Sequence, residues 1–137
     1  MTNNTTDYEP VNPEIAFVNA FILSERRERW VYILSRPKRR REFIAELAHF
    51  KNFDERWLRK IPHAQETPEG IRDVLRAAGA SETCWVISSC SEMDNQEQPL
   101  LESLRLLFCT GYDSIISCIP GHLAYVENEE GRWIAKR

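Results

Sequence analysis

Two short apolar runs, over 83–90 and over 114–119, constrain the fold more than any other feature of this chain. In an extended conformation successive side chains point to opposite faces, so each run would be apolar on both faces. In the first run, for example, Val86 would face one way while Trp85 and Ile87 face the other. A strand that is apolar on both faces is usually covered on both, and the pattern predicts two central strands of one sheet.

The segments around these runs indicate the rest of the architecture. An amphipathic helix beginning at Pro99 separates the two runs, and the turn Pro120-Gly121 would pair 114–119 with 122–127 as an antiparallel hairpin. Residues 132–135 would add a short edge strand. The sequence therefore predicts an α+β fold, in which a helical N-terminal half packs on a small mixed β-sheet of about four strands. The pairing direction of the two apolar runs stays open.

At 137 residues the chain has the size of one domain. Residues 1–11 are polar and aperiodic, which predicts a disordered tail. Residues 12–137 would form a single α+β domain, helical over 12–79 and sheet-containing over 83–136. Asn12-Pro13-Glu14 has the composition of a helix start, and Asp54 would cap a short helix that ends before Pro62.

The composition also indicates the cellular compartment of the protein. No apolar run approaches the ~20 residues that cross a bilayer, and residues 1–13 lack the basic and apolar regions of a signal peptide. The four cysteines form no CxxC pair and no zinc-ligand spacing. We therefore expect a cytoplasmic protein with reduced cysteines that does not enter a membrane.

Charge is distributed unevenly along the chain, whose net charge is −3. Residues 24–61 carry twelve Lys or Arg against six Asp or Glu, a balance of +6, whereas residues 62–131 carry three against twelve, a balance of −9. Such a division indicates either an anionic partner for the first half or attraction between two parts of one fold.

The loop over 88–97 is the first candidate site, because it follows a predicted central strand and leads into a helix. Ligands of open α/β sheets bind at the carboxyl ends of such strands. Three carboxylates in the loop are candidate ligands of Mg²⁺ or Mn²⁺: Glu92, Asp94 and Glu97. The alternative is a solvated acidic connection in which Asp94 caps the next helix.

Cys90 and His122 are the candidate catalytic residues, as nucleophile and general base. The carboxylates close to Cys90 in the sequence would raise the pKa of its thiol, so a buried and inert cysteine is the favoured interpretation. His122 alternatively starts a strand after the Pro-Gly turn.

A basic set in the helical half is the second candidate site, because arginine binds phosphate and carboxylate groups in bidentate fashion. Brought onto one face, these cations would suit a nucleic-acid backbone. Interleaved glutamates and the acidic net charge favour a protein partner instead. The candidate binding residues are Arg39, Arg40, Arg41, Arg56, Arg59 and Lys60.

Nucleotide-binding loops, nucleophile elbows and zinc-protease motifs are absent from the sequence. The first hypothesis is accordingly an interaction or regulatory protein whose arginine-rich helical face or acidic loop binds a protein partner or a second copy of the chain. The alternative is a small metal-dependent enzyme acting on a phosphate-containing or nucleic-acid substrate. A nucleic-acid binder without catalysis is the third class.

Overall fold

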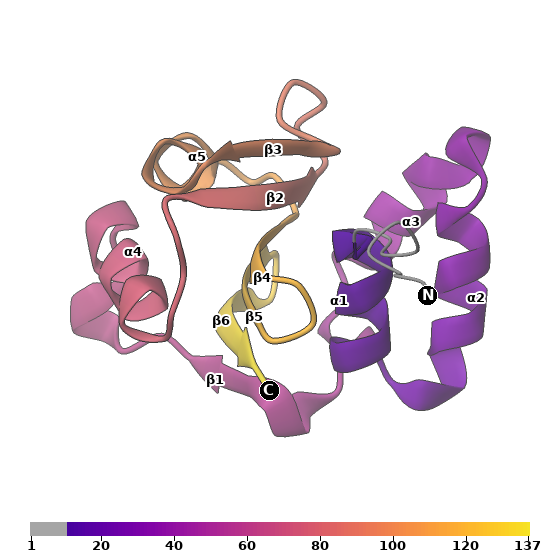
Figure 1. The fold of residues 1–137 in the computed structure, drawn as a ribbon, viewed down its shortest axis with the longest axis horizontal. Coiled ribbons are helices and arrows are strands. Elements are labelled where there is room, and N and C mark those ends of the chain that lie inside the picture. Colours follow the sequence, from indigo (N-terminus) through magenta and orange to yellow (C-terminus); the bar gives the residue numbers. More distant parts are fainter. Residues whose placement is uncertain (1–10) are drawn as a thin grey trace, which may run out of the picture.

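A six-stranded sheet separates two groups of helices in the computed structural model, which describes residues 11–137 (Figure 1). The strand order is β1-β6-β5-β4-β2-β3, and every neighbouring pair is antiparallel. The predicted tail lies outside the described residues except for Val11, which is exposed. The strands are β1 (Leu58–Lys60), β2 (Thr83–Ser88), β3 (Gln96–Pro99), β4 (Ser114–Ile119), β5 (Leu123–Asn128) and β6 (Gly131–Lys136).

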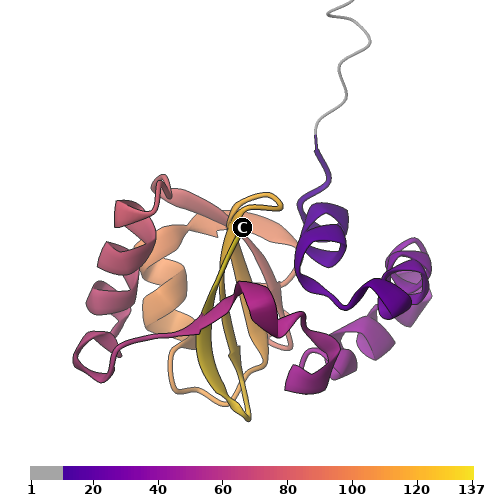
Figure 2. The same ribbon diagram turned by 90° about the horizontal axis from the view of Figure 1, so that it is seen from below.

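Helices cover both faces of the sheet (Figures 1 and 2). The first group is α1 (Pro13–Phe21), α2 (Ser24–Leu34) and α3 (Arg40–Glu46); the second is α4 (Pro68–Ala77) and α5 (Leu100–Leu107). Short 3-10 turns connect them: η2 (Pro37–Arg39), η3 (Phe50–Asn52), η4 (Glu55–Trp57) and η5 (His63–Gln65). Among residues 11–137 no helix combines the length and the apolar character needed to span a membrane.

Alternation along the strands produces two separate cores. Ile87 and Ile115 belong to the core under α1–α3, whereas Val86 and Ile116 belong to the core under α4 and α5. All four side chains are fully buried, and each such side chain contributes about 1.5–3 kcal/mol of hydrophobic stabilisation. The predicted central position of β2 and β4 is therefore confirmed, as is the α+β class.

β3 explains why the two central strands are antiparallel. The sequence predicts a loop over 88–97 that leads directly into a helix, but the chain turns at Asn95, whose φ is 63°, and runs back along β2. This additional reversal makes β4 antiparallel to β2, so the sheet is antiparallel throughout and not mixed. The expectation of a ligand site at the carboxyl ends of parallel strands loses its premise here.

β1 is a second strand that replaces a predicted element. The sequence predicts a short helix after Asp54, and Asp54 does cap η4 by accepting a hydrogen bond from the Arg56 backbone N–H. The chain then extends as β1 and pairs with β6, Leu58 lying opposite Ala135. β6 is consequently an inner strand and not the predicted edge, and the segment 12–79 is not wholly helical.

Candidate functional site

Arg40 connects the arginine cluster to the acidic loop. It begins α3, and its Nε donates to Asp94 Oδ2 at 2.6 Å while its Nη1 and Nη2 donate to Glu14 at 2.8 and 2.7 Å. Trp85 Nε1 donates to Glu14 Oε2 at 2.9 Å, and the Ser88 backbone N–H donates to Asp94 Oδ1 at 2.9 Å. Arg40 therefore fastens α1, α3 and the β2–β3 turn to one another.

The environment of Arg40 holds it charged. Partial burial disfavours the charged form of the Arg40 guanidinium and by itself would lower its pKa. Hydrogen bonds to Glu14 and Asp94 favour the charged form more strongly, so the pKa of Arg40 is raised. Both carboxylates are largely shielded from solvent. Because its donors are already committed to two protein carboxylates, Arg40 is a structural cation and not a free binding residue.

A hollow of about 400 Å³, the Arg41 hollow, lies beside this network and is lined by both candidate sites. Arg40 and Arg41 contribute from α3, and Asp94 contributes from the β2–β3 turn. The basic helix and the acidic loop thus face one hollow, as a phosphate-handling enzyme requires. The remaining lining residues are Ile44, Ser88, Ser89 and Ser91.

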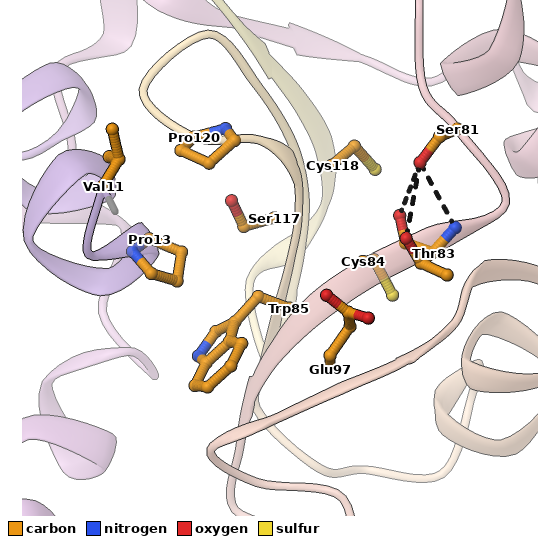
Figure 3. Close-up of a pocket in the computed structure, with 10 residues that line it drawn as sticks. All are labelled: Val11, Pro13, Ser81, Thr83, Cys84, Trp85, Glu97, Ser117, Cys118 and Pro120. Atoms are coloured by element: carbon orange, nitrogen blue, oxygen red, sulfur yellow. Dashed lines mark hydrogen bonds between the residues drawn. The ribbon is translucent and has the colours of Figure 1, made fainter. Parts of the chain in front are cut away.

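The three carboxylates proposed as metal ligands point to different surroundings. Asp94 is bound to Arg40, and Glu92 is exposed to solvent. Glu97, on β3, lines a different hollow of about 300 Å³ together with Trp85 and Thr83 (Figure 3). Across residues 11–137, no group of three or more His, Cys, Asp or Glu side chains is placed to hold a metal ion.

The hollow in Figure 3 contains hydroxyls and thiols from neighbouring strands. Ser81 and Thr83 are hydrogen-bonded to each other. Cys84 of β2 and Cys118 of β4 lie on the face of the sheet that packs against α4 and α5. Burial raises the pKa of Cys84 to about 11, although a hydrogen bond with Ser103 opposes the shift. A thiol with that pKa is protonated at neutral pH and is a poor nucleophile.

Cys90 and His122 lie at opposite ends of β4. Cys90 follows the end of β2, where Ser88 pairs with Ser114 at the start of β4. His122 lies in the turn after Ile119, the last residue of β4, and is exposed. The two side chains are separated by the length of the strand and do not form a nucleophile–base pair; Cys90 itself is buried.

Arg39 belongs to an exposed aromatic and cationic surface on α2 and η2. The guanidinium carbons of Arg36 and Arg39 lie 5.0 and 5.6 Å from the ring centroid of Tyr32, and 48% of Tyr32 is exposed. Arg39 also forms a bidentate pair with Glu42, and that hydrogen bonding raises the pKa of Arg39. We call this the Tyr32 surface; it borders a hollow of about 430 Å³ and comprises Tyr32, Arg36, Pro37, Lys38 and Arg39.

The other predicted binding residues lie elsewhere. Arg56 pairs with Asp54 at 2.7 Å and stacks on Trp57. Arg59 and Lys60 are on edge strand β1 and line a groove against α4, across the sheet from α2 (Figure 1). The six predicted cations therefore divide between an internal network and separate surfaces, and they do not form the single face that a nucleic-acid interface of 38–41 with 56–60 requires.

The sequence does not identify the partners in two features of the candidate sites: the Arg40 network and the Tyr32 surface. The Glu14–Arg40–Asp94 network joins residues 26 and 54 positions apart, and no periodic pattern relates such positions. The Tyr32 surface carries a weak local signal, since Arg36 follows Tyr32 by four residues and i,i+4 side chains are neighbours on a helix.

Another group of hydrogen-bonded polar side chains lies toward the carboxyl end of β5. Glu127 accepts the Tyr125 hydroxyl at 2.6 Å and the Cys109 backbone N–H at 3.0 Å, and both Tyr125 and Glu127 are buried. Arg132 faces Glu127 at 3.5 Å and donates to Glu66 at 2.9 Å. Burial and the hydrogen bond to Glu127 raise the pKa of Tyr125. Because Glu127 and Arg132 are bonded to other groups within the fold, we interpret this network as structural.

Comparison of the chain with protein-family models, with curated proteins and with solved structures finds no match.

Proposed function

We propose that this chain is an interaction protein that binds an acidic segment of a protein partner through the Tyr32 surface. One observation carries the proposal: a half-exposed tyrosine ring with two arginine guanidinium groups within 5.6 Å of its centroid. Tyrosine and arginine are enriched at protein interfaces and at their energetic hot spots. A cation that already stacks on an aromatic ring loses less conformational freedom when it binds.

The charge state of this surface supports an acidic partner. Among residues 11–137, Arg36 and Lys38 have no carboxylate partner, whereas Arg39 is paired with Glu42. Unpaired cations on the rim of an interface attract an acidic partner and speed its association. A second copy of the chain is one such partner, because its residues 62–131 carry a balance of −9.

The experiment is affinity capture with the wild-type chain and with Tyr32→Ala/Arg36→Glu, from an extract of the cells that produce it. The proposal expects a specific protein that wild type retains, that the double variant loses, and that is released by salt but not by nuclease. Arg26→Glu is the matched control, because Arg26 is exposed on α2 but lies six residues, and therefore a different helix face, from Tyr32.

Sedimentation at increasing protein concentration examines self-association with the same three proteins. Capture or self-association that is equal in wild type and in Tyr32→Ala/Arg36→Glu contradicts the proposal. Binding that nuclease abolishes supports the nucleic-acid class instead.

A phosphate-containing substrate is the second candidate, and the Arg41 hollow favours it. Arg41 is exposed and has no carboxylate partner in the described part of the chain, and three serine side chains surround the same space. Its metal-dependent form has less support, because Asp94 is bound to Arg40. Thermal unfolding with and without Mg²⁺ or Mn²⁺ tests the metal-dependent form. A rise in the midpoint temperature that Glu92→Ala abolishes would favour a metal-dependent enzyme, and no rise would disfavour it.

A further inference from the structure

A groove of about 420 Å³ lies between α4 and the strands β1 and β6. We call it the α4 groove. It lies across the sheet from the Tyr32 surface, since α4 covers one face and α2 belongs to the layer on the other (Figure 1). Any ligand of this groove therefore binds independently of the proposed partner of the Tyr32 surface.

The floor of the α4 groove is apolar. Val74, Ala77 and Ala78 contribute from the end of α4, and Ile134 contributes from β6. Ile71 and Leu75 of the same helix are fully buried against the sheet. Val74 and Ala78 pack against the same core but are only partly buried, and Ala77 is exposed, so these three residues leave apolar surface that lines the groove.

Two cations lie on the same face of the sheet as this floor: Arg59 of β1, which is opposite Ile134, and Lys136 of β6. Lys60 also lines the groove, but it lies opposite Trp133, whose side chain belongs to the core on the other face. Within the described range 11–137, neither Arg59 nor Lys136 has a carboxylate partner. The exposed arginines of α4 itself differ, because Arg72 pairs with Asp73 at 2.8 Å and Arg76 pairs with Glu82 at 2.6 Å. In a chain with more acidic than basic residues, two unpaired cations beside one apolar floor form a complementary surface for negative charge.

We propose that the α4 groove binds a short acidic segment of a partner protein, with an apolar side chain on the floor and carboxylates against Arg59 and Lys136. Small-molecule pockets begin at about 300 Å³, so the groove is at the small end of that range. It can therefore accommodate one or two large side chains. Its cations supply the selectivity for an acidic sequence, and its floor supplies the selectivity for an apolar residue between the acids.

Backbone amide spectra of the full chain, titrated with three peptides, separate these two contributions. The probes are Glu-Glu-Leu-Glu-Glu, Glu-Glu-Gly-Glu-Glu, which lacks the apolar side chain, and Lys-Lys-Leu-Lys-Lys, which reverses the charge. The first peptide is expected to shift the amides of Val74, Ala77 and Ala78 with a Kd at or below about 1 mM. The other two are expected to bind at least about tenfold more weakly, which is one 1.4 kcal/mol step.

Arg59→Glu/Lys136→Glu is the matched variant, because both side chains are exposed and neither is part of the core. This variant is expected to raise the Kd for Glu-Glu-Leu-Glu-Glu about tenfold or more, while its amide spectrum outside the groove stays that of wild type. Tyr32→Ala/Arg36→Glu is expected to leave this titration unchanged, which distinguishes the α4 groove from the Tyr32 surface.

Three results overturn the proposal: shifts that map to the Tyr32 surface, equal binding of the acidic and basic peptides, or no shift of the α4 amides at a peptide concentration well above about 1 mM.

Discussion

Arg40 Nε lies 2.6 Å from Asp94 Oδ2, although 54 residues separate the two along the chain. The contact joins the basic first half to the acidic second half inside one fold, which is one of the two explanations that the uneven charge distribution allows. It commits Arg40, from the predicted binding set, and Asp94, from the predicted metal ligands, to each other. Cations without a carboxylate partner in the described part of the chain include Arg36 and Lys38 of the Tyr32 surface, Arg59 of the α4 groove, and Arg41.

Arg40→Ala is expected to lower the free energy of unfolding by about 2 kcal/mol. Removal of one partner from a buried ion pair costs about 3–5 kcal/mol, and the 22% exposure of the Arg40 side chain reduces that cost. The substitution leaves Glu14 and Asp94 without their cation. Urea denaturation measures the change.

Arg41→Ala is the control, because Arg41 is the next residue and is exposed; it is expected to change stability by no more than about 0.5 kcal/mol. Equal effects of the two substitutions on the free energy of unfolding would contradict a stabilising role for the Arg40 network.

Tyr125→Phe is expected to destabilise the fold by about 1–3 kcal/mol, since it leaves the buried Glu127 carboxylate without the hydroxyl that donates to it at 2.6 Å. Thermal or urea unfolding measures the loss. Tyr112→Phe is the matched control, because 41% of Tyr112 is exposed, and it is expected to have little effect. A neutral Tyr125→Phe would contradict the structural role assigned to this pair.

The central strands and the helix starts follow from local sequence. Short runs that are apolar on both faces identify β2 and β4. The Asn12 side chain caps α1 as predicted, by accepting hydrogen bonds from the Glu14 and Ile15 backbone N–H groups. These features depend on residues within one or two turns of each other, so that a pattern of side chains along the chain is sufficient to specify them.

The edge strands and the site do not follow from local sequence. β3 has the sequence Gln-Glu-Gln-Pro, which shows no apolar alternation, and it is a strand because its backbone pairs with β2. β1 has only three residues and depends on β6 in the same way. The partners of Arg40 are likewise set by which elements pack together. Sequence periodicity reports on the burial of one element and not on the identity of its neighbour.

Asp113 and Asp54 are expected to contribute to the pH dependence of stability with opposite signs. Burial, with a contribution from Glu129, raises the pKa of Asp113, so the folded state binds its proton more tightly than the unfolded state does. Its stabilising contribution is complete below the unfolded pKa and is lost as pH rises through the folded pKa. Asp113→Asn is therefore expected to stabilise the protein at pH 7, by no more than about 0.5 kcal/mol, and this gain disappears in acid.

Asp54 supplies the matched opposite case. Hydrogen bonds from Arg56 lower the pKa of Asp54, so its contribution is present above the unfolded pKa and is lost as pH falls through the folded pKa. Asp54→Asn is expected to destabilise the protein at pH 7 and to match wild type in acid. Urea denaturation across the acidic to neutral range measures both variants, and effects of the same sign would contradict the assignment.

Alkylation with iodoacetamide is expected to modify Cys109 long before the other cysteines of the native protein. Cys109 is exposed, so the reagent reaches this thiol without any opening of the fold, and Arg132 Nη2 donates to its sulfur at 2.8 Å. Cys84 and Cys118 have pKa values raised by burial, that of Cys84 to about 11, so both stay protonated and shielded at neutral pH. Mass spectrometry should find one modification in native wild type, none in Cys109→Ser, and four in wild type once urea unfolds the chain. Modification of Cys84 in the native protein at a rate similar to that of Cys109 would instead mean that β2 separates from β3 and α5 under native conditions, because those elements cover its thiol.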